Sequence, residues 1–306
     1  MNAVIFHIFG LPVSAYALAM AFSLAVSLFF ASYCARKAGY CHKAVETFFL
    51  AAIPLCLLLA RLAYVLIRLP FFLERPDGLA FRLWQGGYTL WGAMVGFLMA
   101  GHLTAKGSSL SLPGLLDVMA PAGLLFLALG RFCEGLANQG FGEEAVGGIH
   151  FFPFTVRNAW GEWRWAVFML EGLAALFFMV IVLRKKNLRQ GSKVHLTLVL
   201  VCVFQILFES FREDEFLRWG FVRAGQLLPA VILLGLLIKA LYLQKEKYWH
   251  APRHLAVVGF LLLAALVAAL EFALDKTTLN TYLIYTLMLA TVSGMFALVR
   301  KAVAGE

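Results

Sequence analysis

Nine long apolar segments constrain what this chain can fold into. Crossing the hydrocarbon core of a bilayer takes about 20 mostly apolar residues per helix, and segments of that kind recur throughout the 306 residues. They lie near residues 12–34, 46–67, 88–105, 113–130, 165–183, 195–211, 225–243, 254–274 and 281–299. Only 14% of the residues are charged, which is too few to cover the surface of a soluble domain. We therefore predict an all-α integral membrane protein, a polytopic bundle of about nine transmembrane helices.

The distribution of basic residues predicts the orientation of this bundle. With the N-terminus outside, fifteen of the 26 lysines and arginines fall in or beside cytoplasmic segments, with three acidic residues. The most basic tract is 184-RKKNLRQGSK-193. This is the positive-inside pattern, which places the C-terminus in the cytoplasm. Residues 1–10 hold no basic side chain, so we expect the first helix to be retained rather than cleaved as a secretory signal.

Several classes of site are disfavoured by the same composition. The five cysteines are scattered without CxxC spacing, so we expect neither a metal site nor a disulfide framework, and no cofactor is implied. The basic residues lie in short loops on both sides of the membrane. A nucleic-acid-binding protein needs a basic groove in water, so we expect no nucleic-acid partner.

Ionisable residues at membrane depth are the candidates for function. Placing a charged side chain at the centre of a bilayer costs about 2.5 to 3.5 kcal/mol on insertion scales, so such residues are rare unless they are used. They are Arg61, Asp117, Arg131, Glu134, Glu171, Glu209 and Glu271, with Arg212 and Lys239 near helix ends. We expect Asp117, Glu171 and Glu271 to be locally satisfied polar groups.

Two pairs among them have helical spacing. Arg131 and Glu134 stand at i and i+3, as do Glu209 and Arg212, so each pair is predicted to meet on one helix face. Arg61 is expected at the same outer level of the bundle. An alternative is that each pair is a solvated interfacial ion pair worth about 0 to 1 kcal/mol. Clustered guanidinium groups instead favour a phosphate, which they bind bidentately, and lipid headgroup phosphates lie at this depth.

Two further features concern packing and domain organisation. Gly92 and Gly96 have the four-residue spacing that lets a neighbouring helix backbone approach closely. The last two predicted helices carry one acidic residue, Glu271, and look like a structural appendage. We therefore divide the chain into a membrane domain, 1–244, and an additional helical pair, 245–306.

Six short stretches, taken in order, carry a family resemblance. They are 12-PVSAYALAM-20, 60-ARLAYVLIRLPFFL-73, 84-WQGGYTLWGAMVG-96, 130-GRFCEGLANQGFG-142, 208-FESFRED-214 and 225-GQLLP-229. The chain resembles the prolipoprotein diacylglyceryl transferases, bacterial inner-membrane enzymes that move a diacylglyceryl group from phosphatidylglycerol to the lipobox cysteine of a prolipoprotein. The resemblance runs from about residue 10 to 243 and leaves the last two helices without a counterpart.

The resemblance implies a set of site residues. The family's conserved arginine falls on Arg131, which would face a lipid phosphate, and the family's glutamate falls on Glu209. The residues that would line the pocket are Tyr16, Arg61, Trp91, Gln139, Gly142, Gln205, Arg212 and Gln226.

Four positions in or beside the six stretches depart from the family pattern. Trp91 stands where the family has its motif histidine, a proposed base for the cysteine thiol, and tryptophan cannot take a proton. Glu134 replaces an asparagine, Gln139 the signature glutamate, and Gln205 a second arginine. One phosphate-binding arginine is therefore kept, another is lost, and a carboxylate has appeared.

The function implied by the resemblance is diacylglyceryl transfer in the bacterial cytoplasmic membrane, with phosphatidylglycerol or a related glycerophospholipid and a prolipoprotein signal peptide as partners. Glu134 or Glu209 would then replace the histidine as proton acceptor. A carboxylate of ordinary pKa near 4 is a poor base for a thiol near 8.5, unless the cationic site acidifies the thiol. Two alternatives stay open: the same scaffold with a different acceptor, and a membrane protein that binds or transports phospholipid without catalysis.

Overall fold

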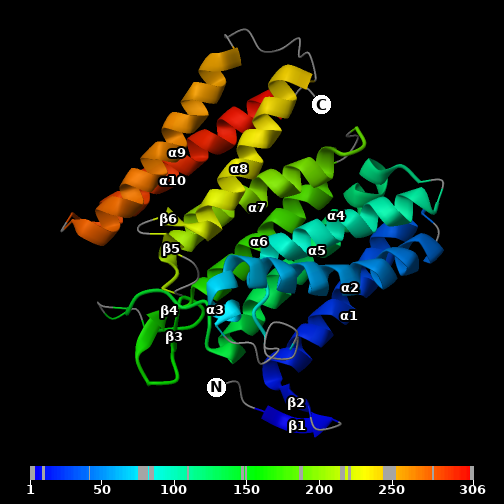
Figure 1. Ribbon diagram of the computed structural model, residues 1–306, viewed down its shortest axis with the longest axis horizontal. Helices are drawn as coiled ribbons and strands as arrows, with labels where there is room; N and C mark the ends of the chain where they lie inside the picture. Colours follow the sequence, from blue (N-terminus) through cyan, green and yellow to red (C-terminus); the bar gives the residue numbers. More distant parts are fainter. Residues whose placement is uncertain are drawn as a thin grey trace. The chain divides into compact units, whose positions relative to one another are not determined.

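The computed structural model describes residues 4–8, 11–40, 42–74, 82, 86–108, 110–145, 148, 150–185, 189–213, 218–219, 222–243, 253–277 and 279–303. Figure 1 shows that these residues are mostly helical. The prediction of an all-α polytopic membrane protein is confirmed, because eight helices in the described part of the chain are long and apolar enough to cross a membrane. They are α1 Ala15–Lys37, α2 His42–Ile67, α5 Leu112–Glu134, α6 Val167–Arg184, α7 Ser192–Phe211, α8 Ala224–Ile238 with its π-helical continuation η4 Lys239–Leu243, α9 Arg253–Lys276 and α10 Thr281–Val303.

The remaining predicted segment, 88–105, forms the shorter helix α4. It covers Leu90–Lys106, and Thr89 caps it by accepting a hydrogen bond from Gly92 N. Its 17 residues give a length of about 26 Å, which falls short of the roughly 30 Å hydrocarbon core. Each of the nine predicted segments therefore contains a helix, and α4 is the shortest of them when α8 is taken together with η4.

In the described residues, three small antiparallel hairpins and one short α-helix lie before or between the long helices. The hairpins pair β1 Val4–Ile8 with β2 Leu11–Ser14, β3 Thr155–Arg157 with β4 Trp163–Trp165, and β5 Arg218–Trp219 with β6 Val222–Arg223. The short helix is α3 Leu69–Leu73. These elements of two to five residues were not predicted, because loops this short carry no measurable hydrophobic periodicity.

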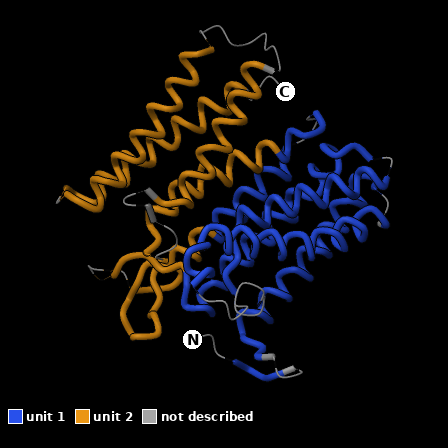
Figure 2. Tube along the Cα trace, viewed as in Figure 1, with its two compact units in different colours: residues 1–139, 172–194 blue, residues 140–171, 195–306 orange. Residues whose placement is uncertain are grey.

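The chain forms two compact units, which Figure 2 distinguishes by colour. Unit 1 comprises Met1–Gln139 and Gly172–Val194, and unit 2 comprises Gly140–Glu171 and His195–Glu306. In unit 1, buried alanines such as Ala31, Ala52 and Ala100 pack around Phe48 and Met119. Small side chains let apolar helices approach closely inside a membrane, where van der Waals packing provides much of their association.

Helices α2 and α4 of unit 1 approach each other closely. A Cβ on Gly92 would lie 2.3 Å from the Leu59 carbonyl oxygen, and a Cβ on Gly96 would lie 2.7 Å from Cys56 Cα. No side chain larger than hydrogen fits at either position without moving the α2 backbone. The prediction that these two glycines admit a neighbouring backbone is therefore confirmed.

Asp117 is satisfied locally, as predicted. Its two carboxylate oxygens accept hydrogen bonds from Gly191 N and Val194 N, at 2.7 and 2.8 Å. These N–H groups lie at the start of α7, where backbone donors have no partner within the helix. Asp117 thus caps a neighbouring helix.

Gly96→Ala is expected to lower the thermal unfolding midpoint of the purified protein in detergent, because overpacking of a close interface costs about 1 to 3 kcal/mol. Gly235→Ala is the matched control, since no other described part of the chain comes within 4 Å of a Cβ at Gly235 in α8. Alanine there should leave the midpoint unchanged or raise it, with a gain of about 0.4 to 1 kcal/mol. Equal midpoints for the two variants would contradict the packing described for α4.

Candidate functional site

The C-terminal end of α5 carries the predicted Arg131–Glu134 pair. Arg131 Nη1 lies 2.5 Å from Glu134 Oε1, and the two side chains are 12% and 16% exposed. The predicted i, i+3 contact is therefore confirmed. A guanidinium in the last helical turn also interacts favourably with the unpaired carbonyl groups of the helix end. The pair is held by one rigid helix and remains partly accessible.

The start of α1 lies beside this pair. Tyr16 is in the first turn of α1 and close enough to Glu134 and Arg131 to interact electrostatically with both. Two turns further along, Ser23 Oγ lies 3.6 Å from Cys133 Sγ, so α1 and α5 pack side by side here. The structure thus brings Tyr16, Arg131 and Glu134 together, as the resemblance implies.

The chain turns sharply after this pair. A 3₁₀ turn, η3 Gly135–Ala137, follows α5, and Asn138 adopts the left-handed conformation with φ 55°. Gln139 N donates to Glu134 O at 3.1 Å, while the Gln139 side chain is exposed. Gln139 is therefore fixed through its backbone, one turn beyond the pair.

Arg61 is nearly fully buried on α2 and holds the segment that leads into α4. Its Nη1 donates to the carbonyl oxygens of Gly86 and Gly87, and its guanidinium lies 5.6 Å from the ring centroids of Tyr64 and Phe72. Trp91 is half-buried in the first turn of α4. The described contacts of Arg61 are thus to backbone oxygens and aromatic rings within unit 1.

In unit 2, the predicted pairing of Glu209 with Arg212 is wrong. Arg212 Nη1 lies 2.7 Å from Glu171 Oε2 of α6, and Glu209 Oε2 instead accepts from Gln205 Nε2 at 3.0 Å. The physical reason is that α7 ends at Phe211, so Arg212 lies beyond the regular turn that would place it above Glu209. Glu171 is therefore paired through one carboxylate oxygen, Oε2, with a residue of the candidate site.

The Glu209 carboxylate packs against the start of α8. It is 7% exposed, and a Cβ on Gly225 would lie 2.4 Å from Glu209 Oε2. Glycine at position 225 therefore leaves the space that this carboxylate occupies. Gln205 and Glu209 lie one turn apart on α7, so the amide at position 205 orients the carboxylate.

Sequence reasoning missed Arg223, which stands just before α8. This side chain is 8% exposed and donates from Nη1 to Glu209 O at 2.6 Å and to Arg212 O. These carbonyl groups belong to the end of α7, where no following turn supplies donors. Only its position two residues before the 225-GQLLP-229 stretch hints at this role.

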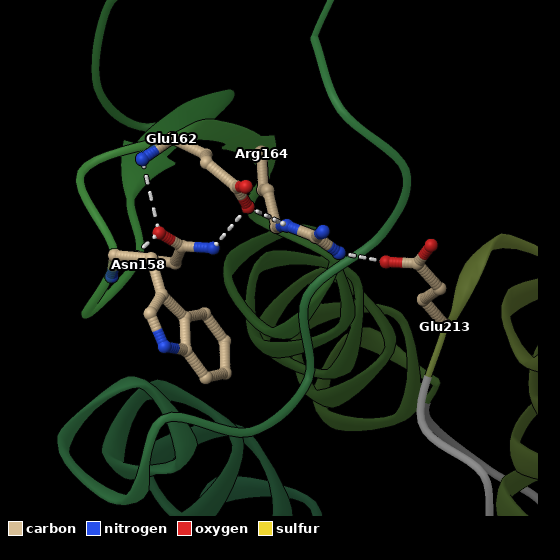
Figure 3. A network of polar contacts seen from close by, with 5 residues as sticks. Asn158, Glu162, Arg164 and Glu213 are labelled. Carbon is tan, nitrogen blue, oxygen red and sulfur yellow. Dashed lines mark hydrogen bonds and ion pairs between the residues drawn. The ribbon is translucent and has the colours of Figure 1, made fainter.

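The β3–β4 hairpin is connected to the end of α7 by charged residues, which Figure 3 shows. Arg164 lies between two carboxylates, with Nε 3.2 Å from Glu162 Oε2 and Nη1 paired with Glu213. Asn158 also donates to Glu162 at 2.8 Å. The Asn158 hydrogen bond and the Arg164 guanidinium hold the pKa of the Glu162 carboxyl below its ordinary value.

Two further predicted residues, Gly142 and Gln226, lie in the same unit. Gly142 N donates to Trp165 O at 2.8 Å, and a Cβ there would lie 2.7 Å from the Phe211 carbonyl oxygen. Gln226, 6% exposed, lies in α8 and donates to Ser210 Oγ at 2.8 Å. The described residues contain no group of three His, Cys, Asp or Glu side chains that could hold a metal ion.

The sequence is similar to proteins of one known family. A family model described as prolipoprotein diacylglyceryl transferase matches residues 3–242. Proteins named phosphatidylglycerol--prolipoprotein diacylglyceryl transferase are similar along most of their length. The one from Staphylococcus saprophyticus is 24% identical, over 84% of this chain and 94% of its own length. The one from Clostridium novyi is 26% identical, over 78% of this chain and 95% of its own length. The Bacillus cereus protein is 29% identical over 62% of this chain and 71% of its own.

Glu171→Leu is expected to destabilise the protein by about 3 to 5 kcal/mol, because removing one partner of a buried ion pair leaves the other charge uncompensated. The double variant Glu171→Leu/Arg212→Met should recover most of this loss, since it removes both charges. Thermal unfolding midpoints in detergent test both expectations. A single variant as stable as the double variant would show that the pair does not act as a unit.

Proposed function

Because the chain belongs to the prolipoprotein diacylglyceryl transferase family, we propose that it transfers the diacylglyceryl group of phosphatidylglycerol to the lipobox cysteine thiol of a prolipoprotein. The observation that carries this proposal is the family match over residues 3–242. The matched region includes the Arg131–Glu134 pair, the residues around Glu209 and the helices α1 to α8. The names of the relatives give the two substrates, phosphatidylglycerol and a prolipoprotein. The eight long apolar helices suit a protein that acts on membrane-embedded substrates.

The reaction makes one bond and breaks one. The cysteine sulfur attacks the glyceryl carbon that carries the phosphate ester, so a C–S bond forms while that C–O bond breaks. Glycerol phosphate leaves with the electron pair of the broken bond, and the thiol proton passes to a base. The protein must therefore stabilise charge developing on a phosphate and accept one proton.

Arg131 is suited to the phosphate. Its planar guanidinium can donate two parallel hydrogen bonds to phosphate oxygens, and its position at the end of α5 is partly accessible. Glu134, which already contacts one nitrogen of Arg131, would orient the guanidinium. The Tyr16 hydroxyl, close to both charges, would bind the same headgroup.

Glu209 is the residue we assign to the proton. Its carboxylate hydrogen-bonds to a neutral amide, that of Gln205, whereas Glu134 is bonded to an arginine. Because Trp91 of α4 stands where the family has its histidine, we assign the proton to a carboxylate, that of Glu209 on α7. Since an ordinary carboxylate is a weak base for a thiol, the transfer also requires a thiol acidified by nearby guanidinium groups.

The function is tested with purified protein in liposomes that contain phosphatidylglycerol radiolabelled in its acyl chains, together with a lipobox peptide. We expect label on the peptide and an equal amount of released glycerol phosphate. Label on a different nucleophile would support the alternative acceptor. Stoichiometric binding of phosphatidylglycerol with no released glycerol phosphate would mean that the protein binds the lipid without turnover.

In the same assay, Arg131→Ala is expected to abolish transfer while the protein stays folded in the membrane. Arg131→Lys should lose most of the activity, because an ammonium keeps the charge but not the bidentate geometry. Size-exclusion chromatography and thermal unfolding verify that both variants are folded. Transfer by Arg131→Ala at the wild-type rate would refute the assignment of Arg131.

We also propose that the N-terminus lies outside and the C-terminus in the cytoplasm of a bacterial cytoplasmic membrane. The support is the excess of basic residues in the segments that this orientation makes cytoplasmic. A green fluorescent protein fused to the C-terminus should fluoresce, and alkaline phosphatase fused there should be inactive. The opposite result would reverse the orientation. Within this frame, 1–244 is the proposed transferase domain and 245–306 the additional helical pair.

A further inference from the structure

The helices beyond the family match contact the candidate site in unit 2. The match ends at residue 242, and α9 and α10 follow it, side by side against α8 in Figure 1. An appended pair that served only to anchor the chain would need no polar residue in its interior. The interior of this pair nevertheless contains Glu271, which is 2% exposed on α9.

Glu271 is bonded to two residues of the matched region. Its Oε1 accepts hydrogen bonds from Ser210 Oγ of α7 and Gln226 Nε2 of α8, and these two donors lie 2.8 Å apart. A carboxylate at membrane depth is costly unless such donors satisfy it. One oxygen of α9 therefore connects the end of α7 to the start of α8.

The contact fixes the orientation of the Gln226 amide. Every hydrogen bond of the Gln226 side chain to the described residues uses Nε2, and the acceptors are Glu271, Ser210 and Ile206 O. An amide with Nε2 turned toward Glu271 has Oε1 turned away from it. In that orientation Gln226 presents an acceptor to a hydroxyl or amide donor. Gln226 directly follows Gly225, whose backbone packs on the Glu209 carboxylate.

The partner helix α10 covers the same place. Met288 Sδ lies 3.0 Å from Ser210 Oγ, and the Tyr285 ring centroid lies 4.4 Å from that of Phe211. Tyr285 also interacts electrostatically with Arg223 and Glu271. The two appended helices thus contact residues 210 and 211, which adjoin Glu209 and Arg212.

We propose that Glu271 is a positioning residue of the transferase, which holds the Gln226 amide so that its Oε1 accepts a hydrogen bond from the glycerol hydroxyl of the lipid headgroup. This inference rests on the proposed function. It assigns the appended helices a role in catalysis through Gln226, and it explains why a buried carboxylate is present beyond the family match, which ends at residue 242.

The test measures kcat/KM for phosphatidylglycerol in the liposome assay. Glu271→Leu should lower it about tenfold or more, because Gln226 loses its charged acceptor. Leucine also suits a membrane helix, so this variant is expected to fold. Glu271→Gln should stay within about threefold of wild type, since its carbonyl oxygen can accept the same two bonds. A role in packing alone would not distinguish glutamine from leucine in this way.

A double-mutant cycle tests whether Glu271 acts through Gln226. In a Gln226→Ala background, Glu271→Leu should cause no further loss of kcat/KM. Thr291→Val is the matched control, because Thr291 is 5% exposed on α10 and donates only to Leu287 O of its own helix. This control should retain wild-type kcat/KM.

Each outcome separates the inference from the function on which it rests. If the wild-type protein transfers no label, the proposed function fails and Glu271 has no reaction to serve. If wild type is active and Glu271→Leu matches Thr291→Val, the inference is overturned while the function stands. An additional loss from Glu271→Leu in the Gln226→Ala background would also overturn it, because Glu271 would then act by another route.

Discussion

The end of a helix leaves backbone carbonyl groups without a donor in the helix, and those that are buried need a donor from elsewhere in the chain. In unit 2 the organisation around the end of α7 follows from this constraint. Arg223 donates to the carbonyl oxygens of Glu209 and Arg212, which closes the helix end with a charged donor. The side chain is nearly fully buried, so it is itself stabilised only through such bonds. Because Arg223 immediately precedes α8, this contact also brings the start of α8 to the end of α7.

Consecutive residues at this helix end contact different segments of the chain. Ser210 bonds to Glu271 of α9, Phe211 packs on Tyr285 of α10, Arg212 pairs with Glu171 of α6, and Glu213 pairs with Arg164 of the β3–β4 hairpin. Glu209, the first of the run, is thereby held between fixed neighbours. A catalytic carboxylate benefits from such support, because its position relative to the reacting atoms then depends on rigid elements rather than on its own rotamer.

In unit 1 the charged pair, Arg131 and Glu134, lies within a single helix rather than between two helices. Arg131 and Glu134 contact each other within the last turns of α5, and Tyr16 approaches from α1. Arg61 is directed to the backbone of Gly86 and Gly87, where it orders the entry to α4 and thus the position of Trp91. Arg131 carries a planar guanidinium, which suits a phosphate, at a partly accessible helix end, and this is why it is the proposed anchor.

The sequence by itself determined the long helices and the contact between Arg131 and Glu134. Apolar runs of about 20 residues can satisfy their backbone in lipid only as helices, so the long helices were predictable, whereas α3 and the short hairpins were not. The i, i+3 spacing of Arg131 and Glu134 was enough to predict their contact, since both lie on one regular helix. The partners of Glu209, Arg212 and Glu271 were decided only by the tertiary structure. Their contacts join α6, α7, α8 and α9, and the periodicity of one helix carries no information about which side chain of another helix will face it.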